Sequence, residues 1–151
     1  MGGSAWLPDR RFGALYTSTG EQGPRCALEE MRRHPATTSP DGPVLGSPAA
    51  LILRPFVFAE LRVRLGRVVD FRVLPDFGWT DDDLYGTPED RAPQRLAEIA
   101  YTRGAEGVLV RSAAKESCIN LVIYPGNPHG WSPASVFEPT GQQVLYHDLL
   151  P

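Results

Sequence analysis

Alternating hydrophobic and polar residues predict several short strands along the chain. The clearest covers residues 56–65, where Leu61, Val63 and Leu65 alternate with two arginines, the two-residue period of a half-buried strand. Gly66 ends it. Further strands are expected at 12–18, 67–73, 107–111 and 119–124, the last two paired with each other, and at two edge segments, 136–137 and 144–146.

Hydrophobic residues at helical spacing predict two helices. The first begins at Pro24, which suits the first helical position, and ends before Pro35. Ala27, Leu28 and Met31 form its buried stripe. The second helix rests on the spacing of Leu96, Ile99, Ala100 and Arg103, with Gly104 as its C-cap.

The segments between these elements are rich in turn-forming residues. The chain has 15 prolines and 15 glycines, and residues 36–50 read as an exposed loop. Short helices are expected to start at Thr80 and Thr87, and a turn is expected at 125–128. Strands and helices mix without regular βαβ alternation. The sequence therefore predicts one α+β domain over residues 1–151, a mainly antiparallel mixed sheet flanked by short helices.

Composition argues against several classes of protein. The formal net charge of -3 disfavours a nucleic-acid-binding protein, which usually needs a basic face. No apolar run is long enough to span a membrane, and the three histidines lack metal-ligand spacing, so no metal site is expected. Cys26 and Cys118 can form one bridge at most. Since no export signal is visible, two buried thiols are expected.

A stretch near the N-terminus combines the groups that a nucleotide site needs. A cationic turn with Arg10 and Arg11 leads into a short strand that carries Tyr16, and the following helix carries Glu29 and Glu30. An arginine can bind a pyrophosphate through paired hydrogen bonds, and a tyrosine ring can stack on a flat ligand. A carboxylate can stabilise a cation that develops on a ribose. The sequence therefore predicts a nucleotide site here.

Several separated segments resemble the RES domain family, which is named for an arginine, a glutamate and a serine. The resemblance is strongest over residues 5–125. It rests on the strand with Tyr16, on 27–34, on 107–114 followed by 119–122, and on a middle region at 69–71 and 94–97.

The resemblance implies a fold similar to that of ADP-ribosyltransferase toxins. RES proteins are mostly toxins of bacterial toxin–antitoxin pairs that cleave the nicotinamide–ribose bond of NAD by hydrolysis or phosphorolysis. Their usual partner is an Xre-type helix-turn-helix antitoxin. The resemblance thus implies NAD as the substrate, no metal, and action in the bacterial cytoplasm or in the cytoplasm of a cell to which the domain is delivered. A homodimer is a further expectation.

The family's residues carry over to particular positions of this chain. Glu30 is expected to be the catalytic carboxylate, with Glu29 as the alternative. Tyr16 is expected to stack on the nicotinamide ring, and Ser112 to hydrogen-bond the substrate.

The family arginine is less easily placed. Family members usually carry it farther upstream, which corresponds here to Ala5 or Trp6. Either Arg11 or Arg10 serves after a shortened linker, or the arginine is lost. Two alternatives to an NAD-cleaving enzyme therefore stay open: a degenerate RES domain that binds NAD or a partner without turnover, and an ADP-ribosyltransferase that acts on a protein.

Overall fold

The computed structural model describes residues 13–33, 38–39, 42–43, 57–72, 92–112 and 115–145. Arg10, Arg11 and the helix starts expected at Thr80 and Thr87 lie outside these residues. The described elements are β1 (Leu15–Ser18), α1 (Gly23–Arg33), β2 (Thr38–Ser39), β3 (Gly42–Pro43), β4 (Val57–Arg64), β5 (Val68–Asp70), α4 (Ala92–Thr102), β6 (Gly107–Arg111), β7 (Ile119–Ile123) and β8 (Val136–Leu145).

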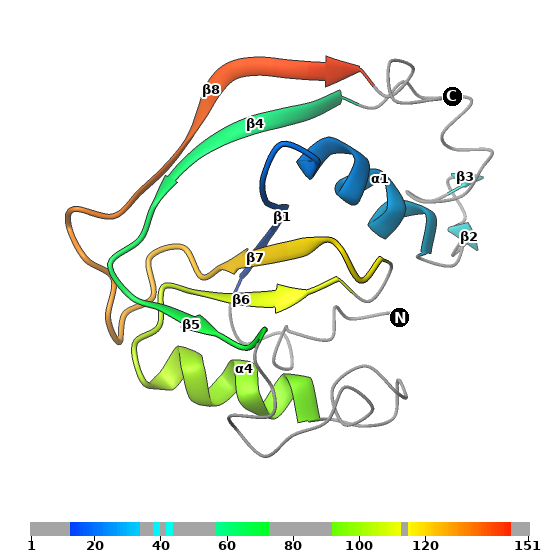
Figure 1. The fold of residues 1–151 in the computed structure, drawn as a ribbon. Coiled ribbons are helices and arrows are strands. Elements are labelled where there is room, and N and C mark those ends of the chain that lie inside the picture. Colours follow the sequence, from blue (N-terminus) through cyan, green and yellow to red (C-terminus); the bar gives the residue numbers. More distant parts are fainter. Residues whose placement is uncertain are drawn as a thin grey trace.

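A four-stranded sheet in the order β1-β7-β6-β5 forms the centre of the fold. The β1–β7 and β6–β7 pairs are antiparallel, whereas β5 and β6 are parallel. The parallel pair needs a crossover connection, and α4 lies between the two strands in the sequence. In Figure 1, α4 runs along one side of the sheet, and α1 and the curved β4–β8 ribbon lie above it in that view. The predicted α+β class, the mainly antiparallel pairing and the β6–β7 pair are confirmed.

Strand β5 is shorter than the expected segment 67–73, because a local turn ends it. The Asp70 carboxylate accepts a hydrogen bond from the backbone N–H of Arg72 (2.9 Å), and such side-chain turns compete with strand pairing. The guanidinium of Arg72 also binds Asp70 through Nε (2.8 Å) and Nη2 (2.5 Å). This ion pair, through its side-chain hydrogen bonds above all, holds the pKa of Asp70 below its usual value.

The two edge segments expected at 136–137 and 144–146 are one continuous strand instead. β8 has 10 residues and pairs antiparallel with β4. Pro139 and Gly141 interrupt its hydrophobic pattern, so the sequence does not predict one continuous strand. The pairing absorbs them through a register shift between Ala59 and Leu61, where Gly141 has a φ of 89°. The expected alternation is confirmed, since Leu61, Val63 and Leu65 are half-buried, whereas Arg62 and Arg64 are exposed.

The main core forms where α4 packs on the sheet. Ala97 and Ala100 of α4 are buried, whereas Ile99, which shares the helical spacing, is 57% exposed. Small alanines allow the helix to approach the strands closely. Gly104 follows the helix with a φ of 82°, as its predicted role of C-cap requires. The cluster consists of Phe71, Ala97, Ala100, Ala105, Val108, Val110, Val122 and Tyr124.

Helix α1 begins at Gly23, one residue before the predicted Pro24, and ends at Arg33. Leu28 is buried as expected and Ala27 is half-buried, whereas the side chain of Met31 lies outside the described part. Cys26 is a further buried residue of this helix. Within the described part of the chain, no helix is long and apolar enough to cross a membrane.

Glu106, directly before β6, is a buried carboxylate that fastens two loops to the core. Its Oε1 accepts hydrogen bonds from the backbone N–H of Ser132 (2.5 Å) and from Ser135 Oγ (2.7 Å). Its Oε2 accepts from the backbone N–H groups of Gly66 and Arg67. Burial disfavours the charged form, but these hydrogen bonds outweigh it and hold the pKa of Glu106 below its usual value.

The predicted turn at 125–128 is confirmed, and Asn127 anchors it. The residue is buried. Its Nδ2 donates to the backbone oxygens of Tyr101 (2.8 Å) and Ala105 (2.7 Å), which ties the turn to the end of α4. Its Oδ1 accepts from the backbone N–H of His129 (3.0 Å). Every polar group of this amide therefore has a partner.

Candidate carboxylate site

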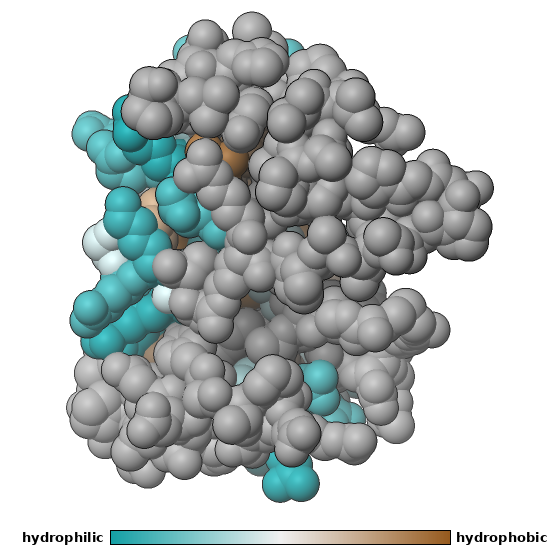
Figure 2. Space-filling model, turned by 90° about the vertical axis from the view of Figure 1, so that its right-hand side faces the viewer, coloured by the Kyte–Doolittle hydropathy of each residue, from teal (hydrophilic) through white to brown (hydrophobic). Residues whose placement is uncertain are grey.

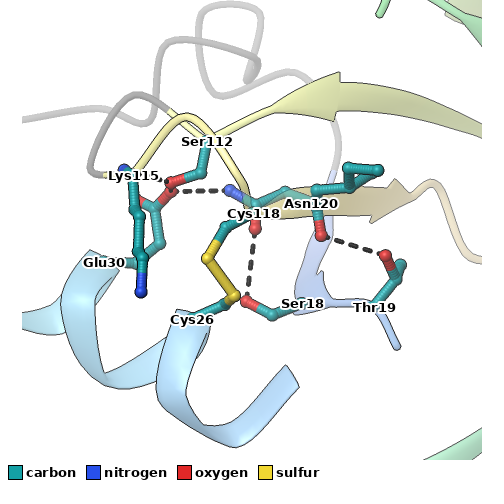
Figure 3. The surroundings of a disulfide bond; sticks show 9 residues. Ser18, Thr19, Cys26, Glu30, Ser112, Lys115, Cys118 and Asn120 are labelled. Carbon is teal, nitrogen blue, oxygen red and sulfur yellow. Dashed lines mark hydrogen bonds between the residues drawn. A yellow bond between two sulfur atoms is a disulfide. The ribbon is translucent and has the colours of Figure 1, made fainter. Parts of the chain in front are cut away.

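The carboxylate of Glu30 lies at the end of the central sheet. Its Oε1 accepts a hydrogen bond from Ser112 Oγ and a second from Asn120 Nδ2, at 2.7 Å. Ser112 follows β6 directly, and Asn120 lies near the start of β7, so one helix and two strands build the site (Figure 3). Both donors are buried. The arrangement brings together Glu30 and Ser112, two of the residues that the sequence predicted.

A second layer fixes the donors. Ser18 Oγ donates to Asn120 Oδ1 (3.2 Å), and the oxygen position of the amide thereby directs its nitrogen toward Glu30. Ser112 Oγ also accepts from the backbone N–H of Lys115 (3.2 Å), which leaves its hydroxyl proton for the carboxylate. Both donors of Glu30 are therefore oriented by other groups, as in a preorganised site.

Tyr16 lies on the same side of β1 as Ser18, because side chains two residues apart on a strand point the same way. The pairing of Ser18 with Asn120 and of Tyr16 with Val122 places both near β7. Tyr16 is 38% exposed. Burial, and secondly the charge of Tyr16 nearby, raise the pKa of Tyr124. An exposed tyrosine thus lies two residue positions along β1 from the Ser18–Asn120 pair, toward Tyr124.

A disulfide joins Cys26 and Cys118 beside this site (Figure 3), with a Cα–Cα distance of 5.7 Å. The expectation of two buried thiols is therefore wrong in its chemistry, although both residues are buried. The expectation rested on the absence of an export signal. The disulfide is possible because folding brings Cys26 and Cys118 within the usual Cα–Cα distance for a bridge.

The surroundings of Glu30 differ from those of Glu106, a second glutamate that accepts several hydrogen bonds near the sheet. Glu106 is fully buried, and each of its oxygens accepts two hydrogen bonds. Glu30 is half-buried, and only its Oε1 accepts hydrogen bonds from described residues. Glu106 is thus saturated, as a structural residue should be. Glu30 is held through Oε1, and its Oε2 accepts no hydrogen bond from the described residues, which is compatible with a ligand-binding carboxylate.

Sequence reasoning missed Asn120, Glu106 and the disulfide. Asn120 could have been found, because it is a lone amide inside the apolar run Ile119–Ile123 and a buried amide needs partners. Glu30 rather than Glu29 accepts the hydrogen bonds of Ser112 and Asn120. Arg10 and Arg11 lie outside the described residues, so the phosphate-binding arginine stays a prediction.

The surface and the metal chemistry of the described part add two observations. In the face that Figure 2 turns toward the viewer, the described residues are mostly hydrophilic, and hydrophobic surface shows only in small areas between them. No group of three or more His, Cys, Asp or Glu side chains among the described residues could hold a metal ion.

Comparison with known proteins gives one match. The model of the RES domain family matches residues 1–146, which is nearly the whole chain of 151 residues. No curated protein and no solved structure matches.

Proposed function

Because the chain belongs to the RES domain family, which is known from toxin–antitoxin systems, we propose that it is an NAD-degrading toxin. It cleaves the nicotinamide–ribose bond by hydrolysis or phosphorolysis. Its sheet and helices are a variant of the ADP-ribosyltransferase fold. The observation that supports this proposal best is the carboxylate of Glu30, held through one oxygen by Ser112 and Asn120.

The proposed reaction moves positive charge from the nicotinamide ring to the ribose, where the carboxylate of Glu30 would stabilise it. The bond between the anomeric carbon and the nicotinamide nitrogen breaks, and its electron pair leaves with nicotinamide. The ribose passes through a cation-like state that a nearby carboxylate stabilises. Water or phosphate then attacks the anomeric carbon and loses a proton, which yields ADP-ribose or its 1-phosphate. Oε2 of Glu30 is the atom that faces the ribose in this scheme.

The other predicted residues take supporting roles. Tyr16 stacks on the nicotinamide ring, and Arg11 or Arg10 binds the pyrophosphate. Ser112 orients Glu30, because its hydroxyl proton is already donated to that carboxylate. An Xre-type antitoxin is the proposed partner, and the cytoplasm of the producing or of a targeted cell is the proposed place of action.

The test is the release of nicotinamide from NAD by the purified protein, with and without phosphate. A Glu30→Gln copy serves as the blank for contaminating activity. We expect release by the natural sequence alone. Phosphate dependence would assign a phosphorylase, and ADP-ribose without phosphate a hydrolase.

Two outcomes would replace the proposal. If folded protein released no nicotinamide but bound NAD, the chain would be a degenerate RES domain. If release required an added protein that became ADP-ribosylated, the chain would be a protein ADP-ribosyltransferase.

Asn120→Leu is expected to lower kcat for NAD cleavage by about 10–100-fold with little change in KM, because the variant removes one of two donors that aim Glu30. Ser18→Ala, which removes only the hydrogen bond behind the amide, should have a smaller effect in the same direction. Steady-state kinetics measures both. An unchanged kcat in Asn120→Leu would show that the Asn120 amide does not contribute to catalysis.

A further inference from the structure

The Cys26–Cys118 disulfide lies within the framework of the Glu30 site. Cys26 and Glu30 are four residues apart on α1, so both lie on the same face of the helix. Cys118 comes two residues before Asn120, and its backbone oxygen accepts a hydrogen bond from the N–H of Ser112 (2.9 Å). The covalent bridge therefore joins the helix that carries the carboxylate to Cys118, which lies between the two donors in the sequence, after Ser112 and directly before β7 with Asn120 (Figure 3).

We propose that the Cys26–Cys118 disulfide is a positioning element that holds Glu30 in register with Ser112 and Asn120. Its effect on turnover rests on the proposed function. The hydrogen bonds of Glu30 alone tie one flexible side chain to the sheet, whereas the disulfide ties the backbone of α1, one turn earlier. Without the bridge, α1 can shift relative to β7. A displacement of about 1 Å is enough to lower a rate about a hundredfold.

Reduction of the Cys26–Cys118 bridge proceeds by thiol–disulfide exchange. A dithiol attacks one sulfur of the bridge, the Sγ–Sγ bond breaks, and the two cysteines gain two electrons and two protons as the dithiol closes into its own disulfide. Both cysteines are buried, with 4% of Cys26 and 2% of Cys118 exposed. Reduction is therefore expected to need an opening of α1, and to be slow in the folded protein.

The chain offers an internal reporter for this proposal, because Asn120 and Asn127 are its only asparagines. Labelling with ¹⁵N-asparagine gives two side-chain NH₂ pairs in an NMR spectrum. Asn120 donates to Glu30, whereas Asn127 donates to backbone oxygens at the end of α4. Glu30→Gln assigns the Asn120 pair, since only that pair should shift.

On reduction with dithiothreitol, we expect the Asn120 pair to move or broaden and the Asn127 pair to stay in place. Reoxidation should restore both. An unchanged Asn120 pair in protein whose thiols are shown to be free would overturn the proposal. Movement of both pairs would also overturn it, since it would mean general unfolding rather than release of α1.

NAD turnover gives the second arm. We expect kcat to fall about 10–100-fold on reduction with KM nearly unchanged, and the Cys26→Ala/Cys118→Ala variant to show the low value with or without the dithiol. If oxidised protein cleaves no NAD, the proposed function fails, but the NMR arm still tests the positioning. If oxidised and reduced protein cleave NAD equally, the positioning fails and the proposed function stands.

Discussion

Replacing Glu30 by glutamine is expected to lower the rate of NAD cleavage on the order of a thousandfold while the fold stays intact. The amide keeps an oxygen that can accept the hydrogen bonds of Ser112 and Asn120. It loses the negative charge that would face the ribose cation. Nicotinamide release measures the rate, and urea unfolding should give a free energy within about 1 kcal/mol of that of the natural sequence.

Glu60→Gln is the matched control for this variant. Glu60 is an exposed glutamate on β4, away from the hydrogen bonds of Glu30, and the same change of charge there should leave cleavage intact. A Glu30→Gln protein that keeps its activity would show that the carboxylate only fastens α1 to the sheet. Loss of both activity and stability would assign Glu30 the same structural role as Glu106.

The sequence predicts the elements of this fold well where the pattern is local. β4 and β6 follow from alternation and an apolar run, and α1 from the spacing of Leu28 and its neighbours. β8 does not follow, because Pro139 and Gly141 break its pattern and only pairing with β4 makes it continuous. The parallel β5–β6 pair also depends on a long-range choice, the crossover through α4.

The residues of the candidate site are likewise predictable from the sequence only in part. The resemblance to the RES family, which the family model confirms, points to Glu30 and Ser112 from the sequence alone. The match could not show that Asn120 donates to the same oxygen of Glu30 as Ser112 does. Glu30 and Asn120 are 90 positions apart in the sequence. The disulfide spans 92 positions, and no local pattern encodes such a pairing. Roles that depend on side chains meeting across the fold need the structure.

Glu106→Ala is expected to lower the free energy of unfolding by about 2–3 kcal/mol, because it removes a buried acceptor and leaves three partly buried backbone N–H groups without it. Glu106→Gln should not rescue the protein. Both carboxylate oxygens accept two hydrogen bonds, and a glutamine would present an NH₂ group to donors at one of these positions. Urea unfolding of both variants, with Glu60→Ala as the exposed control, measures the effect. If Glu106→Gln were as stable as the natural sequence, the hydrogen bonds to both carboxylate oxygens of Glu106 would not be needed for stability.

The pH dependence of stability gives an independent check on Glu106. Its pKa in the folded protein lies below the ordinary value of 4.5, so the unfolded chain binds the proton more readily. The stabilisation from Glu106 is therefore complete above the ordinary value and is lost as the pH falls through the lower pKa of the folded state. The natural protein should lose stability over this acidic range more steeply than Glu106→Ala, which has no such group to protonate. Equal slopes in urea unfolding at a series of acidic pH values would show that the buried carboxylate is not the group whose protonation loosens the two loops.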